Sequence, residues 1–97
     1  MVSKYDKSKE LKDLFIDKDE PVFSTGIVCK LLCIPVWALK QLDDEEIVSP
    51  ERESKTSTRY YSRNELKLVK HCWYYISEEG VRINGLKIIL KMEGYLD

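Results

Sequence analysis

The chain has 97 residues, of which 43% are hydrophobic and 34% are charged, and its formal net charge at pH 7 is −1. This length allows one compact domain and leaves no room for a separate enzymatic lobe, and the hydrophobic content excludes a wholly disordered chain. The near-neutral balance permits nucleic-acid binding without favouring it, because phosphate binders usually carry an excess of Lys and Arg.

Residues 1–20 alternate Lys with Asp and Glu, and they are interpreted as a charged, partly flexible arm that precedes a domain at residues 21–97. Leu11, Leu14 and Phe15 stand at helical spacing within this arm. One or two helical turns that pack on the domain and a fully solvated arm are both compatible with this pattern.

Residues 26–46 carry the pattern of two short helices joined by a tight turn. Ser24 or Thr25 is expected to cap the first helix, and Pro35 fits the first turn of the second. Two such helices form a helix-turn-helix unit. The side chains expected to face the core are those of Ile27, Val28, Leu31 and Leu32 in the first helix and of Val36, Leu39 and Leu42 in the second.

The segment that follows predicts a β-hairpin. Ile47–Pro50 is expected to form a short edge strand that ends at proline, and Arg59–Tyr61 a returning strand with β-favouring aromatic residues. The polar stretch Glu51–Thr58 between them has no candidate core residue and is expected to project as a loop. This hairpin would form the wing.

Two further helices are predicted after the hairpin. Ser62 and Glu65 have the spacing of a capping box, which starts a helix that Gly80 is expected to stop. A fourth helix is expected from about Ile83. The fold class is therefore mostly helical, a winged helix-turn-helix with about four helices and one small β-hairpin. The periodic apolar positions are Leu66, Val69, Trp73 and Ile76 in the third helix and Leu86, Ile89 and Leu90 in the fourth.

Five segments in the same order resemble the MerR-type regulators. Phe23–Leu31 is similar to the opening helix of that family, and Ile34–Asp43 is similar to its second helix. Ile47–Arg52 and Arg59–Ser62 resemble the entry and exit of the wing, the latter matching "Arg-x-Tyr-Ser". Glu79–Leu90 resembles a segment typical of the heat-shock-repressor and glutamine-regulator branches.

The resemblance implies a transcription regulator that binds inverted-repeat promoter DNA, with the second helix in the major groove and the wing on the flanking backbone. Lys40 takes the place of the family's groove-facing arginine, and Arg52 and Arg59 take the places of its basic wing residues. Ala38 and Leu42 depart from the family's threonine and second tyrosine, and these departures concern base reading rather than the fold.

The residue types at these positions suit duplex DNA. Lys and Gln pair with guanine and adenine in the major groove, while Arg and hydroxyl groups bind phosphate oxygens. An exposed Trp37 would pack on a thymine methyl group, or alternatively on the arm or a partner protein. The acidic run Asp43–Glu46 is expected to point away from the DNA backbone. The predicted DNA-binding residues are Trp37, Lys40, Gln41, Arg52, Lys55, Thr58, Arg59, Tyr60 and Arg63.

No enzyme, cofactor or metal site is predicted. Cys29, Cys33 and Cys72 are interpreted as small, buried, reduced thiols, and His71 as a surface or boundary residue. The absence of an apolar run in residues 1–20 predicts a cytoplasmic protein with no membrane anchor.

The expected partner is double-stranded DNA, bound by a homodimer that forms in solution or only on DNA. A protein partner is also compatible with the charged arm or the C-terminal helix. Two alternatives to a regulator remain open from the sequence: a protein-binding adaptor that keeps the fold, and an excision-type factor that bends DNA.

Overall fold

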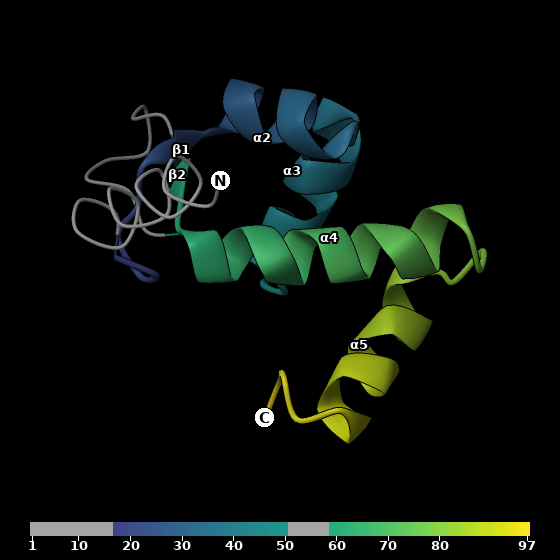
Figure 1. Ribbon diagram of the computed structural model, residues 1–97. Helices are drawn as coiled ribbons and strands as arrows, with labels where there is room; N and C mark the ends of the chain where they lie inside the picture. Colours follow the sequence, from purple (N-terminus) through teal and green to yellow (C-terminus); the bar gives the residue numbers. More distant parts are fainter. Residues whose placement is uncertain (1–16, 51–58) are drawn as a thin grey trace, which may run out of the picture.

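The computed structural model describes residues 17–50 and 59–97, and the elements below lie within these ranges. Figure 1 shows α2 and α3 lying along one side of the long helix α4, while α5 leaves the end of α4 at an angle. The predicted fold class, a mostly helical winged helix-turn-helix, is confirmed. The described elements are β1 (Phe23–Ser24), α2 (Thr25–Leu32), α3 (Val36–Asp44), β2 (Tyr60–Tyr61), α4 (Arg63–Ser77) and α5 (Ile83–Met92).

The first two helices form the predicted helix-turn-helix. The Ser24 side chain caps α2 by accepting a hydrogen bond of 3.4 Å from the Ile27 N–H. Helix α2 ends where Cys33 adopts a left-handed conformation with φ 52°, and the N–H groups of Cys33 and Ile34 both donate to the Cys29 carbonyl. The chain bends by 119° between α2 and α3, within the range of a helix-turn-helix.

The end of α3 is closed by a Schellman turn centred on Glu46. Glu46 adopts φ 58°, its N–H donates to the Asp43 carbonyl at 3.0 Å, and the Ile47 N–H donates to the Leu42 carbonyl at 2.9 Å. The Val48 N–H shares that same Leu42 carbonyl at 3.2 Å. These N–H groups are occupied by the turn, so the predicted strand at Ile47–Pro50 is wrong.

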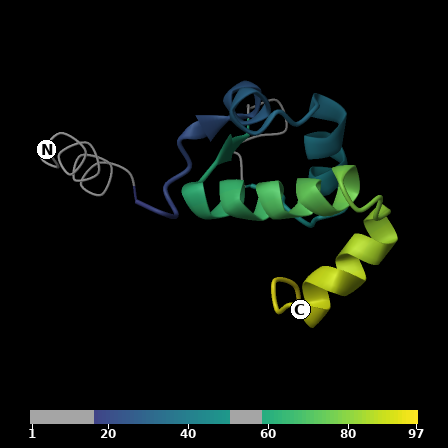
Figure 2. The same cartoon turned by 45° about the vertical axis from the view of Figure 1, so that its right-hand side comes forward.

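The partner of β2 precedes the helix-turn-helix. Strand β2 confirms the predicted return strand, but it pairs antiparallel with β1, with Phe23 opposite Tyr61 and Ser24 opposite Tyr60. The Val22 N–H extends this pairing by donating to the Tyr61 carbonyl at 3.2 Å. The small sheet lies beside the first turn of α4 (Figure 2). The predicted loop at residues 51–58 lies outside the described residues.

Helix α4 begins at the predicted capping box. The Ser62 side chain accepts from the Glu65 N–H at 3.1 Å, and the Glu65 side chain accepts from the Ser62 N–H at 2.9 Å. After α4, Gly80 adopts φ 66° and the Val81 N–H donates to the Tyr75 carbonyl at 3.0 Å. Both helix-boundary predictions, the start at Ser62 and the stop at Gly80, are confirmed, as is the start of α5 at Ile83.

One hydrophobic core joins all four described helices. Three of the side chains predicted to face it do not: Ile27, Leu31 and Val36 are 46%, 58% and 61% exposed. Helices α2 and α3 have only 8 and 9 residues, so each buries a narrow stripe of side chains against a small core. On α2, only Val28 is fully buried. The core consists of Val28, Ile34, Ala38, Leu39, Leu42, Ile47, Val48, Tyr61, Val69, Cys72, Leu86 and Leu90.

The end of the charged arm contacts α4. The Asn64 N–H donates to the Lys18 carbonyl at 3.1 Å, and its side-chain amide donates to Asp19 at 2.8 Å. The helical turns predicted around Leu11–Phe15 lie outside the described residues. Across the described ranges, no single helix is long and apolar enough to cross a membrane. The helices α2 and α3 taken together have the length and composition of a membrane span, but the chain bends by 119° between them.

Candidate nucleic-acid interface

Helix α3 presents a polar and aromatic face to solvent. Its inner face is fixed by Ala38, Leu39 and Leu42, each no more than 1% exposed. The helical period then turns Lys40 and Gln41 outward, and both are exposed as predicted. An exposed helix that follows a sharp turn is the geometry in which a helix-turn-helix offers side chains to the major groove.

Trp37 is exposed by 58% but also rests on α4. Its ring meets Trp73 edge-on, with the ring centroids 6.0 Å apart. Trp37 and Gln41 line a groove of about 390 Å³ together with Ile76, Arg82 and Asn84. The Trp37 indole is therefore packed against α4 while more than half of the side chain stays exposed to solvent.

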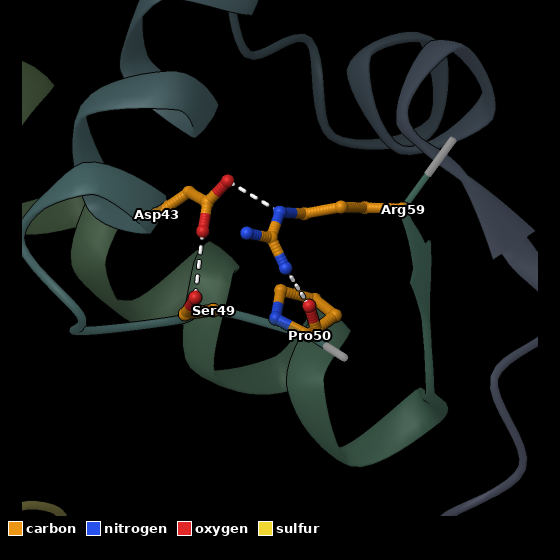
Figure 3. Close-up of polar contacts among 4 residues, drawn as sticks. All are labelled: Asp43, Ser49, Pro50 and Arg59. Atoms are coloured by element: carbon orange, nitrogen blue, oxygen red, sulfur yellow. Dashed lines mark hydrogen bonds and ion pairs between the residues drawn. The ribbon is translucent and has the colours of Figure 1, made fainter. Parts of the chain in front are cut away.

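The C-terminal end of α3 is tied to the base of the predicted wing (Figure 3). The Arg59 Nε lies 2.5 Å from Oδ2 of Asp43, and the Ser49 hydroxyl donates to Oδ1 of Asp43 at 2.6 Å. An Arg59 terminal nitrogen donates to the Pro50 carbonyl. The buried Nε–H finds no hydrogen-bond acceptor of good geometry among the described residues, so its contact with Asp43 is an ion pair. We call Asp43, Ser49, Pro50 and Arg59 the wing-base cluster.

The inward direction of Arg59 differs from what its sequence position predicts. From the sequence, Arg59 is expected to reach for phosphate, and Asp43 is not singled out as its partner. The structure directs two nitrogens of Arg59 inward instead, to Asp43 and Pro50. No local sequence pattern shows this pairing, because its members lie on either side of the predicted loop. A phosphate contact by Arg59 stays a prediction.

The acidic run at the end of α3 is partly neutralised within the molecule. Asp43 pairs with Arg59, and Glu45 pairs with Lys87 of α5 at 2.7 Å. Asp44 and Glu46 are exposed. Two of the four carboxylates thus carry a nearby cation, which reduces the repulsion that this helix end would exert on a phosphate backbone.

The remaining predicted contacts divide between the sheet, the start of α4 and the predicted loop. Tyr60 is 46% exposed, whereas Tyr61 points to the core and is 2% exposed, as strand alternation requires. Burial, and secondarily the Asp43 charge, raises the pKa of Tyr61 to about 12. Arg63 lies half-buried in the first turn of α4. Arg52, Lys55 and Thr58 lie outside the described residues.

The three cysteines differ in exposure. Burial raises the pKa of Cys72 to about 12 and raises the pKa of Cys29. Cys33 is exposed at the turn between α2 and α3, so the predicted burial of this thiol is wrong. Over residues 17–50 and 59–97, no group of three or more His, Cys, Asp or Glu side chains is arranged to hold a metal ion.

A polar and aromatic cluster that the sequence patterns did not indicate joins α4 to the end of α5. His71 Nε2 lies 2.8 Å from Glu93, and the Tyr75 hydroxyl donates to the same carboxylate at 2.9 Å. The hydrogen bonds from His71 and Tyr75 lower the pKa of Glu93. Glu93 lies beyond the predicted periodic pattern of α5, so no core signal marked it.

The fold contains a bent helix pair whose second helix faces solvent, and the wing-base cluster holds the residue before β2 against the end of that helix. These features define a helix-turn-helix of the winged class. Residues 23–93 match the family model described as MerR HTH family regulatory protein. The chain therefore belongs to the MerR helix-turn-helix family of regulatory proteins.

Among curated proteins, the chain is similar to a putative heat shock protein HspR of Streptomyces coelicolor (strain ATCC BAA-471 / A3(2) / M145), with 27% identity over 78 residues. The match covers 80% of this chain and 51% of the relative, so the chain spans about half the length of that relative.

Proposed function

We propose that this protein is a sequence-specific DNA-binding transcription regulator that acts as a repressor. The observation that carries the proposal is the exposed face of α3 after a 119° bend, in a chain whose family model spans residues 23–93. The similarity to a putative heat shock protein supports a role in a stress response.

In the proposed complex, α3 enters the major groove. Lys40 and Gln41 read base edges, because a lysine pairs with guanine and a glutamine pairs with adenine there. The exposed part of the Trp37 ring contacts a thymine methyl group or sugar. The wing and the start of α4 hold the phosphate backbone through Arg52, Lys55, Thr58, Tyr60 and Arg63, and Arg59 adds a contact through the terminal nitrogen that does not donate to Pro50.

We further propose that two copies bind the two halves of an inverted repeat. Ile88 and Met92 stand one helical turn apart on α5 and are 60% and 82% exposed. Such a pair supports self-association through α5, in solution or on adjacent half-sites.

Fluorescence anisotropy with labelled duplexes tests the proposal. We expect binding at about 50 mM salt that weakens steeply towards about 200 mM, because phosphate contacts release counterions. Lys40→Ala is expected to lower affinity for the preferred duplex by about 1–3 kcal/mol and to change the preference among sites. Lys91→Ala is the matched control, since Lys91 is exposed in the last turn of α5.

A folded protein that binds no duplex at about 50 mM salt would contradict the proposal. That result would favour the protein-binding adaptor, which a stable partner recovered from nuclease-treated lysate would then identify.

A further inference from the structure

We infer that Asp43 is a positioning residue for the wing: its carboxylate fixes the base of the wing against the end of the recognition helix α3. This inference rests on the proposed function, because it concerns how the wing reaches DNA. It assigns a binding role to an acidic side chain that on charge alone would oppose DNA.

The wing-base cluster connects three parts of the chain through the side chains of Asp43 and Arg59. One oxygen of Asp43 accepts the Ser49 hydroxyl at 2.6 Å and the other pairs with Arg59 Nε at 2.5 Å. Arg59 in turn donates to the Pro50 carbonyl. The end of α3, the entry to the segment 51–58 and its exit are thereby joined by one carboxylate and one guanidinium.

The cluster is sheltered enough to act as a fixed joint. The side chains of Arg59 and Asp43 are 18% and 17% exposed. Charge pairs screened from water hold their geometry better than fully exposed pairs, and the planar guanidinium is pre-organised for two simultaneous partners. The buried pair Ile47 and Val48, together with Tyr61, anchors the backbone on both sides of the joint.

A carboxylate at the C-terminal end of α3 is electrostatically unfavourable unless a cation pairs with it. The last turn of a helix carries a partial negative charge, so an acidic residue there is disfavoured, and α3 has no basic residue in its last turn. Asp43 also lies one turn after Lys40, the proposed base-reading residue. Pairing with Arg59 offsets this unfavourable charge and holds the residues on both sides of the segment 51–58 against the end of α3.

The test compares Asp43→Asn with the matched control Asp44→Asn in the anisotropy assay. Both substitutions remove one negative charge from the same helix end, but Asp44 is exposed and lies outside the wing-base cluster. An asparagine at position 43 keeps the size and the hydrogen-bonding capacity of the side chain but removes the negative charge that pairs with Arg59. We expect Asp43→Asn to weaken binding about tenfold and to reduce the slope of log affinity against log salt by about one for each phosphate that the wing no longer binds. Asp44→Asn is expected to bind as tightly as the wild type or more tightly.

A second measurement does not depend on DNA. Urea unfolding of Asp43→Asn, Arg59→Gln and the double variant gives the coupling between the two side chains, expected to be about fivefold in the unfolding equilibrium constant. Equal binding and equal salt slopes for Asp43→Asn and Asp44→Asn would overturn the positioning role even if coupling is found. If the wild type binds no duplex, the proposed function fails, and absence of coupling would then also remove the joint itself.

Discussion

Glu46 occupies a backbone conformation that an L-amino acid rarely adopts. Its φ of 58° closes α3 with the Schellman hydrogen bonds to Asp43 and Leu42, a position that glycine fills most readily. A side chain with a Cβ atom in this region costs about 1–2 kcal/mol. The turn is retained because buried Leu42 and Ile47 pack on either side of it.

We predict that Glu46→Gly raises the free energy of unfolding by about 1 kcal/mol, because glycine removes that strain. Urea denaturation measures the change. Glu46→Ala is the matched control, since it removes the charge and keeps the Cβ atom. A gain of the same size in both variants would show that charge rather than backbone strain is responsible.

The elements of this fold differ in how well the sequence predicts them. The starts of α2 and α4 are marked by Ser24 and Ser62, whose side chains act within three residues along the chain. Strand β1 and its pairing with β2 could not be found this way, because β1 has only two residues and its partner is remote in the sequence. The alternation of apolar and polar residues that marks a strand can be recognised only over a run longer than two residues.

The residues of the candidate site also differ in how well the sequence predicts them. The outward face of α3 follows from helical periodicity, which placed Trp37, Lys40 and Gln41 in solvent. The wing-base cluster depends on contacts between segments distant in sequence. Side-chain pairing across such a distance is set by the tertiary fold, so it leaves no local pattern.

At the junction of α4 and α5, we predict that stability depends on the Glu93 carboxylate. The pKa of Glu93 is lowered in the fold by His71 and Tyr75, so the stabilisation is present above the ordinary unfolded pKa of about 4.3 and is lost as pH falls below it. The urea midpoint should therefore decrease from about pH 5 to about pH 3, and less so in Glu93→Gln.

Glu78→Gln provides the comparison for that experiment, because Glu78 is exposed at the end of α4. Its pH profile is expected to follow that of the wild type. Identical acid profiles for Glu93→Gln and the wild type would contradict a stabilising role for this junction.

For the whole molecule, α5 belongs to the same core as the helix-turn-helix. Leu86 and Leu90 are fully buried and are part of the cluster that includes Val28 of α2 and Leu42 of α3. We predict that Leu90→Ala lowers the free energy of unfolding by about 2–5 kcal/mol, the usual range for a leucine truncated in a packed core.

The control for this prediction is Asn84, in the first turn of α5 and outside the proposed self-association pair. Asn84 is exposed, so Asn84→Ala should change the free energy of unfolding by less than about 0.5 kcal/mol. Both values come from urea denaturation followed by circular dichroism. A small effect of Leu90→Ala would mean that α5 does not contribute to the core in solution.

Selection of duplexes from a random pool, followed by sequencing, most directly tests the claim that α3 reads DNA. The purified protein is expected to enrich an inverted repeat, and Lys40→Ala to change the enriched bases within each half-site. Enrichment of no common sequence by a folded protein, or the same sequence for both proteins, would contradict it.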